Sequence, residues 1–192
     1  MPDLTLQQAT TIVEASLRKG RETGCAPLAV AVLDTGGHLK AFAREDGAGI
    51  IRPQIATGKA WGALGMGAGS RTFARRVAEQ PQQQAFFAAL NAMSDGRVVP
   101  APGGVLIRDG AGGAVIGAVG ISGDVSDKDE ACAVAGITAA SSPLTPASTG
   151  RRRAHLRGGA RRLRARAPTK QMGPSAPRAV RCGPFDGPNV PE

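Results

Sequence analysis

Apolar and polar positions follow two different periods over the first 140 residues of the chain. Apolar or small residues recur three and four positions apart from Leu6 to Leu17, which predicts an amphipathic helix ending near Gly20. Thr5 and Gln8 stand at the spacing of a capping box at the start of this helix.

Three later stretches are also predicted to be helical. One begins at Arg52-Pro53, because proline suits the first helical turn, and the others cover residues 81–93 and 127–140, the last capped by Ser126. The helix that begins at Arg52 carries glycine at positions 58, 62 and 65, and each glycine costs about 1 kcal/mol relative to alanine. Since glycine lets another backbone approach closely, we expect this helix to pack tightly on a sheet or on a partner subunit.

Two hairpins lie between these helices. Residues 28–33 are apolar on both faces, which is typical of a central strand, and the turn Asp34-Thr35-Gly36-Gly37 returns the chain along residues 38–44. A second hairpin joins residues 104–108 to residues 114–122. Hairpins separated by helices predict an α+β domain with an antiparallel sheet covered by helices.

Charge divides the chain into two parts. Residues 1–150 hold 13 Lys+Arg and 13 Asp+Glu, whereas residues 151–192 hold 11 and 2, so the net charge of +9 belongs to the C-terminal stretch. We predict one domain over residues 1–140 and a disordered basic tail, rich in Arg, Ala, Gly and Pro, over residues 141–192. Our hypothesis is that this tail is an out-of-frame translation product of GC-rich DNA. A nucleic-acid-binding arm is the alternative, but Phe185 is the one aromatic residue after position 150.

Several classes of protein are disfavoured by composition. No apolar run has the length of a membrane span, and the N-terminus lacks the pattern of a signal peptide. Three widely spaced cysteines without a Cys-x-x-Cys pair argue against a disulfide scaffold or a structural zinc site. We therefore expect a cytoplasmic protein.

Few residues offer chemistry. The chain has two histidines, His38 and His155, which excludes a metal site built of several histidines. His38 follows a turn, where it is either an exposed hairpin residue or a partner for a cofactor. Pro102-Gly103-Gly104 precedes a strand and is either a well-formed turn or a loop whose backbone N–H groups face an anion.

Several stretches, in this order along the chain, resemble one known family. They are residues 28–39 (LAVAVLDTGGHL), 44–48 (REDGA), Lys59-Ala60 with 62–67 (GALGMG), Ser70-Arg71, 102–109 (PGGVLIRD), 116–124 (IGAVGISGD) and Asp129-Glu130 with Cys132-Ala133. Together they are similar to the GlcG/HbpS family. The resemblance implies a profilin-like fold, with a five-stranded antiparallel sheet between helices in three α/β/α layers. It also implies homo-oligomers and haem as a cofactor, because studied relatives bind haem and members are often described as haem-degrading.

Two functions follow from this resemblance, and whether the protein is an enzyme stays open. The first is an oligomeric haem-binding protein that degrades haem slowly, with His38 contacting the iron and Lys59 and Arg71 binding the propionates. The alternative is a small-carboxylate-binding enzyme or accessory protein of 2-hydroxy-acid (glycolate) or aromatic catabolism. In that case the loop Pro102, Gly103 and Gly104 holds the carboxylate together with Lys59, and Asp46 or Glu130 transfers a proton. Neither function requires a membrane or nucleic acid.

Overall fold

A computed structural model describes residues 3–110 and 113–141 of the chain. Their elements, in chain order, are α1 (Leu6–Glu22), β1 (Ala29–Asp34), β2 (Leu39–Arg44), α2 (Arg52–Met66), α3 (Ser70–Glu79), α4 (Pro81–Met93), β3 (Gly104–Arg108), β4 (Val115–Ser122) and α5 (Ser126–Ser141). The predicted helices and both predicted hairpins are present, and α3 is an additional helix. The basic tail and its proposed out-of-frame origin lie outside the described residues, apart from Ser141 at the end of α5.

The sheet of the described domain has four strands in the order β2-β1-β4-β3, and every neighbouring pair is antiparallel. The family resemblance implied five strands, and that number is wrong for the part of the chain described here. The residues between α2 and β3 form α3 and α4 and add no strand to the sheet.

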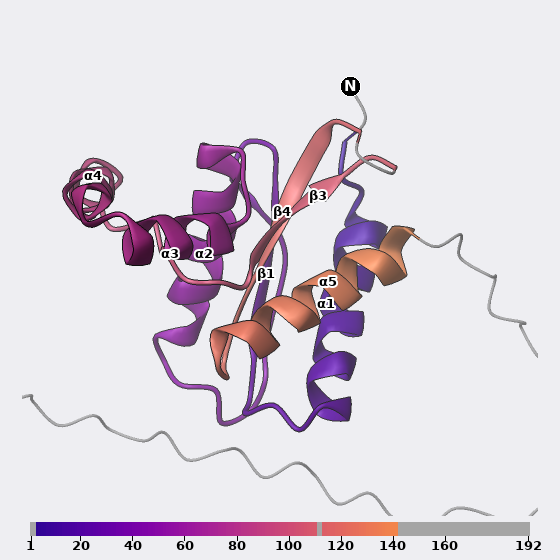
Figure 1. Ribbon diagram of the computed structural model, residues 1–192. Coiled ribbons are helices and arrows are strands. Elements are labelled where there is room, and N and C mark those ends of the chain that lie inside the picture. The colour runs from indigo at the N-terminus through magenta and orange to yellow at the C-terminus, as the bar shows by residue number, and fades with distance from the viewer. Residues whose placement is uncertain (1–2, 111–112, 142–192) are drawn as a thin grey trace, which may run out of the picture. The chain divides into compact units, whose positions relative to one another are not determined.

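Helices cover both faces of the sheet, which gives three layers (Figure 1). Helices α1 and α5 lie side by side on one face, and α2 lies on the other face, against β4, β1 and β3. Helices α3 and α4 continue outward from the α2 layer. This arrangement explains why the central strand β1 is apolar on both faces, because its residues 29–33 are all buried.

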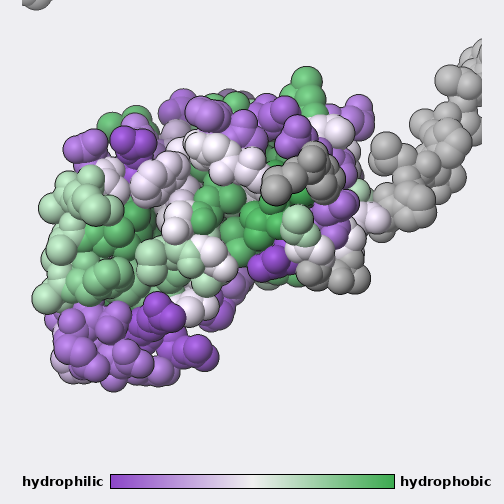
Figure 2. All heavy atoms as spheres, turned by 90° about the horizontal axis from the view of Figure 1, so that it is seen from above, coloured by the Kyte–Doolittle hydropathy of each residue, from purple (hydrophilic) through white to green (hydrophobic). Residues whose placement is uncertain are grey.

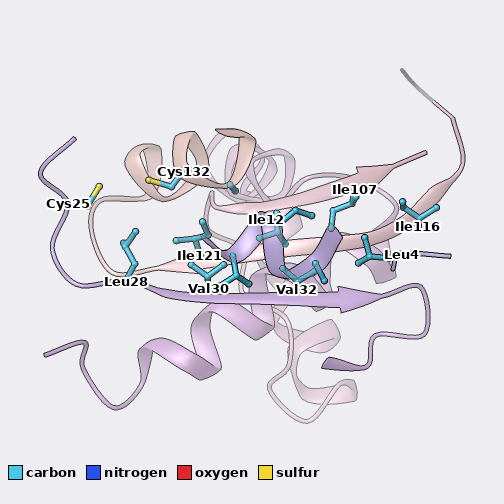
Figure 3. Packing of buried hydrophobic residues seen from close by; sticks show 14 residues of the cluster. Leu4, Ile12, Cys25, Leu28, Val30, Val32, Ile107, Ile116, Ile121 and Cys132 are labelled. Atoms are coloured by element: carbon cyan, nitrogen blue, oxygen red, sulfur yellow. The ribbon is translucent and has the colours of Figure 1, made fainter. Parts of the chain in front are cut away.

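The larger hydrophobic cluster lies between the sheet and the α1–α5 layer (Figure 3). Branched aliphatic side chains of β1 and β4 interdigitate there with one face of α1. The labelled members are Leu4, Ile12, Cys25, Leu28, Val30, Val32, Ile107, Ile116, Ile121 and Cys132.

Helix α2 approaches the sheet so closely that backbone packs on backbone. A Cβ atom on Gly120 of β4 would overlap the carbonyl oxygen of Ala56 and lie 2.8 Å from the amide nitrogen of Ala60. A Cβ atom on Gly104 of β3 would overlap the carbonyl group of Lys59. The close packing expected for this helix is therefore real, but glycines of the sheet and alanines of the helix provide it. The helix glycines at positions 58 and 62 instead face residues 97–99.

Helices α1 and α5 cross in a similar way. A Cβ atom on Gly136 of α5 would overlap the hydroxyl oxygen of Ser16 and lie 2.7 Å from the carbonyl oxygen of Ile12. The Ser16 hydroxyl is fully buried and makes no hydrogen bond. Ser16 therefore serves this crossing through its small size and not through its polarity.

The sequence predicts the N-terminal cap of α1 correctly and that of α5 less accurately. At α1 the capping box is confirmed, since the Thr5 hydroxyl accepts from the Gln8 amide at 3.2 Å and the Gln8 side chain accepts from the Thr5 amide at 2.9 Å. At α5 the predicted cap is displaced by one residue: Ser126 is the first helical residue, and the Val125 carbonyl accepts from the Asp129 amide at 3.1 Å.

Helix α4 keeps much of its apolar side uncovered within the described chain. Phe87 is buried against Phe73, with ring centroids 5.9 Å apart, whereas Phe86 is 47% and Met93 76% exposed. Figure 2 shows apolar surface gathered at the side of the molecule where α4 lies.

The close approach of α2 to the sheet is tested by two glycine substitutions. We expect Gly120→Ala to lower the free energy of unfolding by about 1–3 kcal/mol or to prevent folding, because the new methyl group meets backbone that cannot move aside. Gly65→Ala is the matched control on the exposed side of α2, where the nearest atom to a new Cβ is on Trp61 at 4.0 Å. That variant gains helix propensity, so its free energy of unfolding should rise by about 1 kcal/mol and its urea midpoint should increase. Equal stability of the two variants would contradict backbone packing at Gly120.

Candidate functional site

His38 lies at the tip of the first hairpin and is oriented by the residue that closes the turn. Its Nδ1 atom lies 3.3 Å from Oδ1 of Asp34, and its side chain is 81% exposed. The same Asp34 oxygen accepts from the backbone N–H groups of His38 and Gly36, each at 2.9 Å. The bond from the His38 N–H is the largest influence that lowers the pKa of Asp34, so this carboxylate is ionised when it faces the imidazole.

A groove of about 330 Å³ borders this histidine. Lys40, two residues further along the strand, lines it together with Leu4, Thr35 and Ile116. The hairpin tip thus brings an imidazole and an ammonium group to one surface.

Lys59 is in a different environment, because it is buried in the centre of the domain. Its Nζ donates to Oδ2 of Asp129 at 2.8 Å and to the carbonyl oxygen of Ile121 at 2.9 Å, and the two charged side chains are 3% and 1% exposed. The other Asp129 oxygen accepts from the Asp124 amide at 3.1 Å. Burial lowers the pKa of Lys59 and raises the pKa of Asp129. Removal from water therefore disfavours the charged form of both side chains, and their mutual attraction opposes this effect.

The loop Pro102-Gly103-Gly104 closes over this ion pair. Gly103 has a φ of +117°, and a Cβ there would lie 3.0 Å from both Lys59 Nζ and Asp129 Cβ. The Gly104 amide, expected to face a ligand, instead donates to the buried Ser70 hydroxyl at 2.8 Å. This part of the loop is therefore bound within the protein.

Arg71 is exposed and bridges two carboxylates of α5. It pairs with Glu130 and, through Nη2, with Oδ1 of Asp127 at 2.6 Å. The hydrogen bonds that the guanidinium donates to Glu130 and, with less effect, to Asp127 raise its pKa above the ordinary range. A groove of about 580 Å³ is lined by Arg71, Arg75, Pro102 and Glu130.

The predicted residues therefore fall into three places. Arg71, Pro102 and Glu130 share one groove, with the loop and Lys59 directly behind it. His38 lines another groove, and Asp46 is exposed beside Arg21 and Arg44 in a third. No group of three His, Cys, Asp or Glu side chains suited to a metal ion occurs within residues 3–110 and 113–141. In the same residues, no helix is long and apolar enough to cross a membrane.

Sequence reasoning missed an apolar groove of about 500 Å³ on the other side of the first hairpin. Leu39, Phe42, Pro53 and Trp61 line it, and the Arg97 guanidinium stands 5.2 Å from the centroid of the Trp61 ring. Strict alternation would put Leu39 and Phe42 on opposite faces of β2. A register shift, in which Val32 pairs with Ala41 but Leu33 pairs with Leu39, brings the two side chains to one groove.

The buried ion pair is tested by removing one charge and then both. We expect Lys59→Met to lower the free energy of unfolding by about 3–5 kcal/mol at neutral pH, because Asp129 is left buried without its partner. The double variant Lys59→Met/Asp129→Asn should recover most of this loss, since no charge remains. Urea denaturation measures both.

The same variant has a defined pH dependence. Burial already raises the pKa of Asp129, and without Lys59 the folded carboxyl holds a proton that the unfolded chain has released. The loss of stability in Lys59→Met should therefore be smallest near pH 4 and grow towards pH 7. A loss that is independent of pH would show that the ion pair is not its cause.

Comparison with known proteins bears on the family and the fold. The family model described as "Haem degrading protein HbpS-like" matches residues 4–138. The fold is similar to protein ORFY of Klebsiella pneumoniae, at 26% identity and a TM-score of 0.66, covering 75% of this chain and 95% of that one. It is also similar to PduOC in a crystal structure of its haem complex, at 25% identity and a TM-score of 0.64, covering 72% and 95%.

A third similar structure is HbpS, at 28% identity and a TM-score of 0.59, covering 72% of this chain and 90% of that one. A double mutant of HbpS from Streptomyces reticuli matches equally well, with 87% of its length covered. No curated protein matches the sequence. The family match spans more than two thirds of the chain, and the chain therefore belongs to the HbpS-like family of haem-degrading proteins.

Proposed function

We propose that this protein binds haem and that His38 contacts the iron. The observation that carries the proposal is the pairing of His38 with Asp34 at an exposed hairpin tip. The family description and the haem complex of PduOC support the choice of haem over other ligands.

The Asp34–His38 pair has the arrangement that metal-ligating histidines use. Such histidines direct one ring nitrogen to a carboxylate or carbonyl, which fixes the ring and makes the other nitrogen more basic. Here Nδ1 faces Asp34, so Nε2 is the nitrogen left for iron. The chain has no tyrosine, and His38 is the one histidine within the described residues, so an imidazole ligand from this part of the chain would come from the hairpin tip.

The propionate partners differ from those the sequence favoured. Lys59 is buried with Asp129, and Arg71 is paired with Glu130 and Asp127. Lys40 is exposed and lines the same groove as His38, which makes it the better partner for a propionate. When bound, haem would supply redox chemistry at its iron, and the residues of the hairpin tip would hold and orient it.

We further propose a cytoplasmic homo-oligomer in which haem lies close to a subunit contact. The groove beside His38 is smaller than a haem, whereas the groove of Leu39 and Trp61, on the same hairpin, is larger and mostly apolar. A second copy of the chain that covers this apolar surface would place a subunit contact on the hairpin that carries His38. Haem degradation, which the family description names, is proposed as a slow consequence of binding.

Haem titration of the purified protein tests the proposal. We expect a shifted Soret band at micromolar haem in the wild type and its loss in His38→Ala. Asp34→Asn keeps acceptor and turn geometry and should weaken haem binding about 10–100-fold. Arg75→Ala, in another groove, is the control and should bind normally.

Two further measurements separate ligation of the iron by His38 from porphyrin binding as such and from changes in oligomeric state. Metal-free protoporphyrin should still bind His38→Ala, because it needs no iron ligand, and fluorescence quenching of Trp61, the single tryptophan, reports it. Light scattering gives the mass in solution with and without haem. An unchanged Soret titration in His38→Ala would refute the assignment of the iron contact.

A small carboxylate at the groove beside Pro102 is the second candidate, and Arg75 favours it. Arg75 lines this groove, and no ion pair of its guanidinium is found within the described residues, unlike Arg71. Glycolate and related 2-hydroxy acids should then raise the melting temperature of the wild type, because a ligand of the folded state stabilises it, but not that of Arg75→Ala. No shift at millimolar acid in either protein would remove this candidate.

A further inference from the structure

Two cysteines from distant parts of the chain end in the same corner of the core. Cys25 belongs to the connection between α1 and β1, and Cys132 lies on α5. Both are free thiols, buried at 5% and 1% exposure, and both belong to the cluster under the α1–α5 layer. Figure 3 shows them at one end of this cluster with their sulfur atoms turned toward each other.

Hydrogen bonds hold the segment of Cys25 between the end of α1 and the residues that precede α5. The Cys25 amide donates to the Gly20 carbonyl at 2.9 Å, and the Ala26 amide donates to Oδ2 of Asp124 at 2.8 Å. The Thr23 hydroxyl lies 3.4 Å from the Cys25 sulfur. The position of Cys25 relative to α5 is therefore fixed from both sides of the residue.

The Cys25 thiol also acts directly on Cys132. Burial raises the pKa of Cys132 to about 12, and the neighbouring Cys25 thiol is the next largest contribution. A sulfur atom in this environment stays protonated at neutral pH and reacts slowly with reagents from solution. Cys25, in a connecting segment and the more exposed of the two, is the sulfur that an oxidant reaches first.

We propose that Cys25 and Cys132 form a reversible disulfide that locks the α1–β1 connection to α5 under oxidising conditions. The oxidant is a small-molecule disulfide. The Cys25 thiolate attacks one of its sulfurs, which forms a mixed disulfide and releases the first small thiol. Cys132 then gives its proton to solvent and displaces the second small thiol from Cys25. Two S–H bonds are lost, one S–S bond forms in the protein, and the S–S bond of the reagent is reduced to two thiols.

The lock would act on the helix that carries the residues of two sites. Asp129 and Glu130 precede Cys132 on α5 by less than one turn, so the crosslink fixes the segment that holds Lys59 and Arg71. It closes a loop from residue 25 to residue 132, and crosslinks that close long loops restrict the unfolded chain strongly. In a reducing compartment the dithiol is the resting form, and the disulfide forms when the thiol pool becomes oxidised.

The test uses the full-length chain with Cys182→Ser, so that Cys25 and Cys132 are the remaining cysteines. The protein is incubated with a graded series of oxidised and reduced glutathione and then quenched with acid. We expect loss of both titratable thiols, a decrease in mass by two hydrogens, and a peptide pair joining the segments of Cys25 and Cys132. The melting temperature should rise by about 5 °C or more and return to its starting value with reductant.

Cys25→Ala and Cys132→Ala, each in the same background, are the matched controls. Neither should gain melting temperature on oxidation, because neither can form the crosslink, and Cys132→Ala should accumulate the mixed disulfide on Cys25. The denatured chain, treated identically, shows that the reagent is competent to join these cysteines. Thiols that persist in the folded protein while the denatured chain is crosslinked would overturn the proposal, as would a crosslink that lowers the melting temperature.

Discussion

The buried contact between Lys59 and Asp129 connects the two helical layers of this domain. Lys59 comes from α2 on one face of the sheet and Asp129 from α5 on the other, and their side chains meet where β4 ends. The ammonium group reaches this point because α2 lies with its backbone directly on Gly120 and Gly104, which have no side chains to hold it away. Since the same ammonium also binds the Ile121 carbonyl, the contact fixes sheet, helices and loop together.

The groups left for ligands consequently lie at the margins of this centre. The Gly104 amide is bound from behind by the Ser70 hydroxyl, and Pro102 of the same loop lines the Arg71 groove. The hairpin tip is different, because Asp34 orders His38 through local bonds that need no support from the core. The haem site that we propose at the tip therefore requires no change in the buried centre.

Local patterns in the sequence were sufficient to predict the helices and strands but not the contacts between residues far apart in the chain. Thr5 with Gln8, the turn at residues 34–37 and the apolar run of β1 each carry their structure in short-range chemistry, and each was predicted correctly. The partner of Lys59 is 70 positions away, so no local pattern connects it with Asp129. The shift of register in β2 comes from its pairing with β1, and strict alternation therefore hid the groove of Leu39 and Phe42.

The tight crossing of α1 and α5 has a consequence for how the domain folds. These helices are the first and last elements of the described chain, and Gly136 against Ser16 and Ile12 leaves no room for either helix to turn independently of the other. Much of the core under the sheet is therefore completed by contacts between residues more than a hundred positions apart. Contacts of such high sequence separation slow folding, because the chain must lose the entropy of closing the loop before the contact stabilises it. During synthesis, the core between α1 and the sheet therefore stays incomplete until α5 has left the ribosome.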